Sequence, residues 1–187
     1  MMSAFAGNPA LTDPDPIRSL EECYEARWYA VYTRANHEKR VSEQLGGAGL
    51  ERFLPLYSSV RRWKDRKVTL EMPLFPGYVF VRIALQYRLR VLQVPGVARL
   101  VGFNGSPAAL PSIEIEAIRA SLVQGVPVQP HPYLVCGQPV RLRSGPLAGL
   151  TGILVRQKSK ARLIISLELI QRSVAVELDE ADLVAGP

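Results

Sequence analysis

Cysteine and histidine are scarce in this chain of 187 residues, which has two of each. Cys23 and Cys136 lie far apart and neither has a cysteine neighbour, so the pattern indicates neither a disulfide framework nor a zinc site. His37 and His131 have no cysteine or carboxylate at the spacing of metal ligands. We therefore expect no metal and no cofactor, and a chain that works in a reducing cytoplasm.

Long apolar runs and catalytic motifs are also missing. No run reaches the ~18 residues that a membrane helix needs, and the first residues lack the basic start and apolar stretch of a secretory signal. The sequence contains no phosphate-binding loop, no nucleophile elbow and no dinucleotide fingerprint. We expect no membrane segment, no catalytic residues and no enzymatic activity.

Positive charge is present in excess, and it is unevenly distributed. The formal net charge of the chain is +6, but residues 27–132 carry 15 basic and 7 acidic side chains, a local excess of +8. A basic surface attracts phosphate backbones, which indicates contact with a nucleic acid. The alternative is that the charge only keeps the chain in solution.

Composition and proline placement divide the chain into four segments. Residues 1–26 hold three prolines among small and acidic residues, which predicts a disordered or loosely ordered tail. Residues 27–125 have the periodicity of a folded domain. Residues 126–133 contain Pro127, Pro130 and Pro132, which favour an extended linker, and residues 134–187 form a second domain.

In residues 27–125, short strand patterns alternate with two helical ones. The patterns WYAVYT, RFLPLYSSV, VTLEMPLF and GYVFVRI predict strands, and the second and third are joined as a hairpin with the basic tip RRWKDRK. We expect one helix to be capped by Thr33 or Asn36 and to end at Gly46, and another to span 112–125 with Ser112 as its cap. In residues 134–187, four short strand-like runs separated by Gly, Ser and Lys predict a small β-barrel.

The stretch MPLFPGYVFVR holds two aromatic side chains beside two prolines and a glycine. Pro73 and Pro76 restrict the backbone, so Phe75 and Tyr78 lose little conformational freedom on binding. Aromatic side chains held in this way are suitable anchors for an apolar partner helix. The alternative is that they belong to the hydrophobic core, as aromatic residues in strands usually do.

At this point the motifs resemble a known family. WYAVYTRANHEKRVSEQL, PLFPGYVF and VPGVARLVGF are similar to the N-terminal domain of the NusG family of transcription elongation factors. GQPVRLRSGPLAGLTGILV (137–155) resembles a KOW motif, with Gly145, Pro146, Gly149 and Gly152 at the expected places. The stretch SLELIQRSVAVELD is similar to specialised NusG paralogues of the UpxY or RfaH type, which regulate long operons.

The resemblance implies an α+β fold, in which an antiparallel sheet flanked by helices is followed by a small KOW barrel. It implies a non-catalytic, monomeric factor that binds the clamp helices of bacterial RNA polymerase and suppresses pausing and termination. The residues at the matching polymerase-binding positions are Trp28, Tyr32, Phe75, Pro76, Gly77 and Tyr78. We expect these side chains to line one hydrophobic depression.

The resemblance also implies further partners. A row of basic residues on the first helix would face upstream DNA or the non-template strand, and the hairpin tip would add to this contact; these residues are Arg34, His37, Arg40, Arg61, Arg62, Lys64 and Lys67. The KOW domain would bind a small-subunit ribosomal protein or the termination factor Rho. Two alternatives stay open: a KOW-type RNA-binding or ribosome-associated protein, and a housekeeping NusG that assists Rho-dependent termination.

Overall fold

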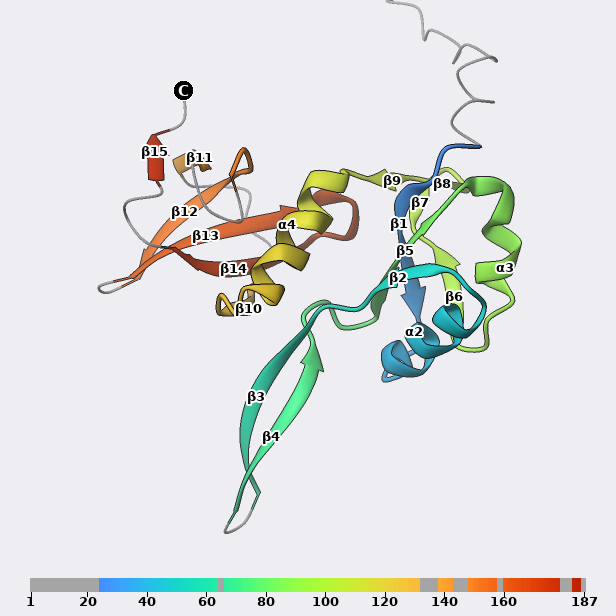
Figure 1. Cartoon of the computed structure of the whole chain (residues 1–187), viewed down its shortest axis with the longest axis horizontal. Coiled ribbons are helices and arrows are strands. Elements are labelled where there is room, and N and C mark those ends of the chain that lie inside the picture. Colours follow the sequence, from blue (N-terminus) through green and yellow to red (C-terminus); the bar gives the residue numbers. More distant parts are fainter. Residues whose placement is uncertain are drawn as a thin grey trace, which may run out of the picture.

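The computed structural model of the chain describes residues 24–63, 66–131, 138–142, 148–157, 160–178 and 183–185 (Figure 1). Most of the predicted tail and both cysteines therefore lie outside the described residues. The chain folds into an N-terminal α+β part and a C-terminal β part. This confirms the fold class expected from the sequence, in which an antiparallel sheet with helices precedes an all-β antiparallel sheet.

The N-terminal part contains short strands and three α-helices in the described residues. Its elements are β1 (Arg27–Thr33), α2 (Glu38–Gly47), β2 (Glu51–Phe53), β3 (Leu56–Trp63), β4 (Arg66–Pro73), β5 (Tyr78–Ile83), the 3-10 turn η1 (Leu85–Tyr87), α3 (Arg88–Leu92), β6 (Val97–Leu100), β7 (Gly102–Phe103), β8 (Ser106–Pro107), β9 (Ala109–Leu110) and α4 (Ser112–Val123).

β1 is the central strand of the N-terminal sheet. The strand order is β2-β5-β1-β6, β9 also pairs with β1, and all these pairs are antiparallel. Five of the seven residues of β1 are buried, because its run of aromatic and aliphatic side chains is covered on both faces.

The two faces of this sheet belong to different cores, because successive side chains of a strand point to opposite faces. Tyr29 and Val31 of β1 pack with Val79 of β5 and with Val41 of α2 in one cluster of buried residues, which also includes Val91 of α3. Helices α2 and α3 therefore cover this face.

The opposite face is covered by α4 and by the C-terminal sheet. Trp28 of β1 and Phe80 of β5 share one cluster of buried residues with Ile118 of α4 and with Leu163 and Val174 of the C-terminal sheet. Figure 1 shows α4 between the two sheets. The two parts of the chain thus share a continuous hydrophobic core.

The C-terminal part is an antiparallel sheet of six described strands. Its elements are β10 (Val128–His131), β11 (Gln138–Leu142), β12 (Thr151–Gln157), β13 (Lys160–Leu167), η2 (Glu168–Ile170), β14 (Arg172–Leu178) and β15 (Leu183–Ala185). The strands pair in the order β10-β14-β13-β12-β11-β15. Its closure into a barrel stays a prediction.

Part of the predicted linker is a strand. β10 pairs with β14, and Pro130 stands opposite Val174. A proline that lacks a backbone N–H is tolerated there, because β10 is the first strand in the order and has one described neighbour. The domain boundaries drawn from the sequence otherwise stay a prediction.

β3 and β4 form a two-stranded ribbon that extends away from both sheets (Figure 1). The predicted hairpin is therefore present. Its basic tip is described only in part: Lys64 lies outside the described residues, and Arg61, Arg62 and Lys67 are described only through their backbone pairing.

The caps of both predicted helices differ from the expectation. The first begins at Glu38 with His37 as its N-cap residue, not Thr33 or Asn36, because Thr33 belongs to β1 and Asn36 has a left-handed backbone with φ of 60°. The second begins at Ser112 after Pro111, so Ser112 is its first residue rather than its cap. Within the described part of the chain, no helix combines the length and apolar character needed to cross a membrane.

Candidate functional site

Two tyrosines and an arginine lie side by side at one end of the N-terminal sheet; we call Tyr32, Tyr78 and Arg99 the aromatic row. Tyr32 stands opposite Tyr78 on β5 and opposite Arg99 on β6. The tyrosine ring centres are 5.4 Å apart, and the Arg99 Cζ atom is 5.3 Å from the centre of the Tyr32 ring. Tyr32 is 39% exposed and Tyr78 is half-buried, so a partner can reach this row directly.

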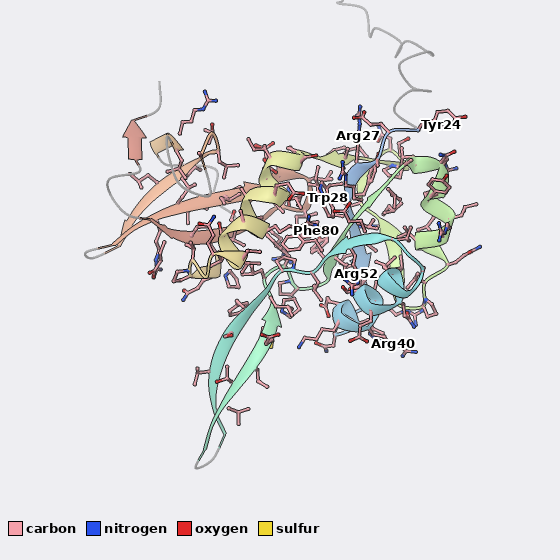
Figure 2. The ribbon with its side chains drawn as sticks, in the orientation of Figure 1. Tyr24, Arg27, Trp28, Arg40, Arg52 and Phe80 are labelled. Atoms are coloured by element: carbon pink, nitrogen blue, oxygen red, sulfur yellow. The ribbon has the colours of Figure 1, made fainter. Side chains whose placement is uncertain are left out.

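The other two predicted aromatic anchors lie in the core. Phe75 is 1% exposed and packs edge-on against Phe80, with ring centres 5.4 Å apart. Trp28 is also 1% exposed, and the Arg119 Cζ atom lies 4.9 Å from the centre of its ring. Figure 2 shows Trp28 and Phe80 inside the fold. The expected depression lined by all four side chains is therefore reduced to the aromatic row, because α4 and the C-terminal sheet cover the rest of this face.

The Pro76–Gly77 turn holds Tyr78 in place. The Tyr78 N–H donates a hydrogen bond to the Phe75 carbonyl at 3.0 Å, and the Thr33 N–H donates to the Gly77 carbonyl at 2.8 Å. Gly77 has φ of +84°, and a Cβ atom there would lie 3.3 Å from the Tyr32 ring. Glycine is required at this position because other residues rarely adopt this conformation and would press on the row.

Glu38 supports the same turn, and sequence reasoning missed it. The Gly77 N–H donates a hydrogen bond to Oε1 of Glu38 at 2.7 Å, and Glu38 is 6% exposed. The available signal was an acidic residue in the first turn of the predicted helix, which is ordinarily explained by the helix dipole alone.

The three predicted basic contacts near α2 lie close together in the chain, but they do not form one helical ridge. Arg34 lies in the turn before the helix, His37 is the N-cap residue, and Arg40 is on the helix. Arg34 and Arg40 are exposed; His37 is half-buried, with its Nδ1 atom 2.9 Å from the Ala35 carbonyl oxygen. Since Arg34 directly follows β1, this basic group begins at the same end of the sheet as the aromatic row.

The KOW glycines that the structure describes allow backbone conformations and close strand contacts that other residues would hinder. Gly149 has φ of +83°, and a Cβ atom at Gly152 would lie 2.7 Å from the Ile164 carbonyl oxygen. Gly152 therefore permits the close approach of β12 and β13. Gly145 and Pro146 lie outside the described residues.

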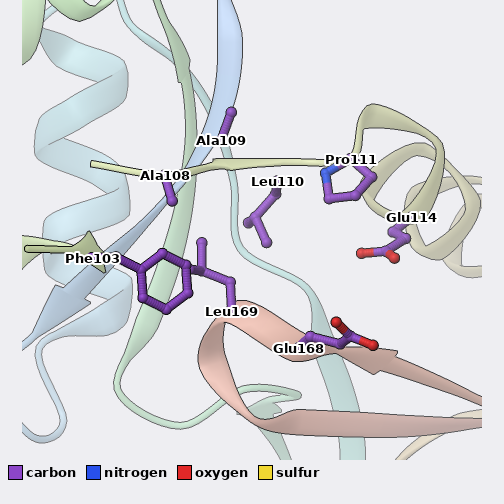
Figure 3. Close-up of a pocket in the computed structure, with 8 residues that line it drawn as sticks. All are labelled: Phe103, Ala108, Ala109, Leu110, Pro111, Glu114, Glu168 and Leu169. Atoms are coloured by element: carbon purple, nitrogen blue, oxygen red, sulfur yellow. The ribbon is translucent and has the colours of Figure 1, made fainter. Parts of the chain in front are cut away.

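Two carboxylates meet where α4 contacts the C-terminal part of the chain. Glu114 of α4 and Glu168 of η2 line one pocket of about 410 Å³, together with the apolar side chains of Leu110, Leu169 and Phe103 (Figure 3). Burial, and to a lesser extent the charge of Glu168, raises the pKa of Glu114 to about 7. None of the predicted site residues is among the described residues that line this pocket.

Among the described residues, no group of three or more His, Cys, Asp or Glu side chains is arranged to hold a metal ion. The site consists instead of an exposed aromatic row beside basic residues, on a sheet whose turns are fixed by hydrogen bonds. Exposed aromatic and basic side chains of this kind are suited to contact with another macromolecule.

Comparison with known proteins identifies the family. The model of the family described as "Transcription termination factor nusG" matches residues 26–119. The transcription termination/antitermination protein NusG of Escherichia coli O6:H1 is 30% identical over 181 residues, which cover 86% of this chain and 96% of the relative. NusG of Yersinia pestis is 29% identical over 188 residues, covering 89% of this chain and all of the relative.

The chain therefore belongs to the NusG family of transcription termination/antitermination factors, which are non-catalytic. A solved structure described as "Domain interaction in Thermotoga maritima NusG" agrees with the fold, with a TM-score of 0.55 at 21% identity, covering 87% of this chain and 98% of that chain. The resemblance expected from the sequence motifs is confirmed at the level of the family.

Proposed function

We propose that this protein is a cytoplasmic transcription elongation factor that binds the clamp helices of RNA polymerase and reduces pausing and termination. The observation that supports this most is the aromatic row, which is exposed at the end of an otherwise covered sheet face. Tyrosine and arginine are enriched at the energetic centres of protein interfaces. A factor that binds the closed clamp more tightly than the open one shifts polymerase toward the elongating state.

Phe75 and Pro76 complete the proposed interface on the same turn. Pro76 is exposed, whereas the Phe75 ring belongs to the cluster of buried residues that the C-terminal sheet shares. A partner that contacts the Phe75 ring therefore has to displace part of its cover. In this proposal, polymerase first contacts Tyr32 and Tyr78. Trp28 is buried and supports the interface from within the core.

We propose that the basic residues guide DNA along one side of the bound factor. Arg34, His37 and Arg40 would contact upstream DNA or the non-template strand, and the β3–β4 ribbon would carry Arg61, Arg62, Lys64 and Lys67 toward the same polyanion. The +8 excess of residues 27–132 supports this contact. Phosphate contacts position a protein on DNA but do not read its sequence.

We further propose that residues 27–125 bind polymerase, and that residues 134–187 form a KOW domain that recruits a small-subunit ribosomal protein or Rho. The position of the gene in the genome distinguishes a specialised UpxY- or RfaH-type paralogue from a housekeeping NusG. A gene that opens a long biosynthetic operon supports the specialised paralogue, whereas a gene beside translocation and ribosomal protein genes supports the housekeeping form.

Binding of the full chain to core RNA polymerase tests the proposal. The double variant Tyr32→Ala/Tyr78→Ala should bind at least about tenfold more weakly, since truncating one central aromatic typically costs more than ~1 kcal/mol. The matched control is Tyr24→Ala, which removes an aromatic side chain that is 67% exposed and precedes the opposite end of β1.

Phe75→Ala is less informative, because truncating a buried phenylalanine costs about 3–5 kcal/mol of stability and would weaken binding indirectly. Equal binding by the double variant and the Tyr24→Ala control contradicts the proposed interface. RNA binding without polymerase binding by the unaltered chain would support the KOW-type RNA-binding alternative.

A further inference from the structure

Glu38 is a nearly buried carboxylate that joins two distant segments of the chain. It lies in the first turn of α2, and its Oε1 atom accepts a hydrogen bond of 2.7 Å from the backbone N–H of Gly77, 39 residues away. Only 6% of its surface is exposed. A buried carboxylate without partners is costly, so its position calls for a specific role.

Two features offset the cost of burying this charge. The N-terminus of α2 carries a partial positive charge that favours an acidic side chain in the first turn. The hydrogen bond from Gly77 is charge-assisted, and such bonds are roughly twice as strong as bonds between neutral groups. The carboxylate therefore fits this position only while the Gly77 N–H points at it.

The same bond completes the support of the Pro76–Gly77 turn. The Gly77 carbonyl accepts from Thr33 of β1, and its N–H donates to Glu38 of α2, so both polar groups of Gly77 are held by neighbouring elements. The next residue, Tyr78, stands opposite Tyr32 in the aromatic row. Movement of the turn would therefore change the geometry of the row.

We propose that Glu38 is a positioning residue: its carboxylate fixes the Pro76–Gly77 turn against the start of α2, and so holds the aromatic row in the conformation that polymerase binds. The basic residue His37 directly precedes Glu38, and Arg40 lies two residues after it on the same helix start. This inference rests on the proposed function. Without the bond, the turn has to be ordered on binding, which lowers affinity.

The first experiment needs no polymerase and measures the Gly77 amide of the full chain by NMR. Glu38→Ala should move the Gly77 amide proton upfield and speed its exchange with solvent by about tenfold, because the N–H loses its acceptor. Glu38→Gln retains a side-chain oxygen and should restore most of the protection. Rapid exchange of the Gly77 amide in the unaltered chain would overturn the proposal even if Glu38→Ala does not fold.

The second experiment measures affinity for core RNA polymerase with the same variants. Glu38→Ala should bind about tenfold more weakly, and Glu38→Gln should regain most of the affinity. The matched control is Glu43→Ala, the same truncation at an exposed residue of the same helix. This change leaves the Glu38–Gly77 hydrogen bond in place and should leave binding unchanged.

The two experiments separate the possible failures. If the unaltered chain does not bind polymerase, the proposed function fails, and the positioning role in binding fails with it, while the NMR result still decides whether Glu38 holds the turn. If the chain binds but Glu38→Ala and Glu43→Ala bind equally well, the positioning role is wrong and the proposed function stands.

Discussion

Replacing Glu114 by glutamine tests how the contact between α4 and the C-terminal part depends on pH. Glu114 shares a pocket with Glu168, and no cationic side chain is among the described residues that line this pocket. Burial in this pocket, assisted by the charge of Glu168, raises the pKa of Glu114 to about 7 from its ordinary value of 4.5. Figure 3 shows the two carboxylates on facing segments.

The sign of the effect follows from proton binding in the two states. Below pH 4.5 the Glu114 carboxyl is protonated in both the folded and the unfolded chain. As pH rises further, the unfolded chain releases this proton first, so folding stability falls. The stabilisation is fully present below the unfolded pKa of 4.5 and is lost as pH rises through about 7.

The two pKa values of Glu114, folded and unfolded, set an upper limit on this change in folding stability. Taken at face value, the difference corresponds to an upper limit of ~3 kcal/mol. Because Glu114 is only half-buried, solvent screens the interaction, and we expect about 1 kcal/mol. In a chain of this size, that change lowers the melting temperature by about 2–4 °C.

Thermal unfolding of the full chain, measured by circular dichroism between about pH 5 and pH 8, checks this value. Over this pH range, the melting temperature of the unaltered chain should fall by about 2–4 °C more than that of Glu114→Gln. Glu116→Gln is the matched control, because Glu116 is exposed on the same helix. Parallel pH profiles for the unaltered chain and Glu114→Gln would refute the reasoning.

Four further substitutions test the packing of the fold by urea denaturation. Phe75→Ala should lower the free energy of unfolding by about 3–5 kcal/mol, because this ring is buried in the shared core; a loss below ~1 kcal/mol would place the ring at the surface. Gly152→Ala should lower the free energy of unfolding by about 1–3 kcal/mol, because its Cβ atom would overlap the neighbouring strand. At Gly149 a Cβ atom would meet open space, so Gly149→Ala should lower the free energy of unfolding by about 1–2 kcal/mol through its backbone conformation alone. The reverse order would contradict the close approach of β12 and β13. Arg119→Ala should cost about 1 kcal/mol and alter Trp28 fluorescence, because the guanidinium covers that ring; an unchanged spectrum would contradict this contact.

The strands of the N-terminal sheet could be predicted from the sequence because their apolar patterns are local. The run WYAVYT has the side chains of a strand, and β1 spans Arg27–Thr33. Its pattern does not show which rings stay exposed. Trp28 and Tyr32 lie on the same face, but Trp28 is covered by α4, whereas Tyr32 lies where the cover ends.

The position of β10 shows a similar limit. Three prolines in residues 126–133 favour an extended backbone, and the extended prediction agrees with a strand. Whether such a segment stands free or pairs depends on a neighbour, here β14, which lies more than forty residues further along the chain. Local composition contains no information about that partner.

The role of Glu38 was also hidden from sequence reasoning. An acidic residue in the first turn of a helix is common, and its usual explanation requires no distant contact. The hydrogen bond to Gly77 exists because β5 pairs with β1 and brings the Pro76–Gly77 turn to the start of α2. Motifs that are separate in the sequence thus become one site only through the pairing of strands.

Single-round transcription through a pause site by purified RNA polymerase tests the central claim most directly. The unaltered chain should shorten the pause, and the Tyr32→Ala/Tyr78→Ala double variant should lose this effect while Tyr24→Ala retains it. A pause that the unaltered chain leaves unchanged, or that the double variant shortens equally well, would contradict the claim that the aromatic row binds polymerase and favours elongation.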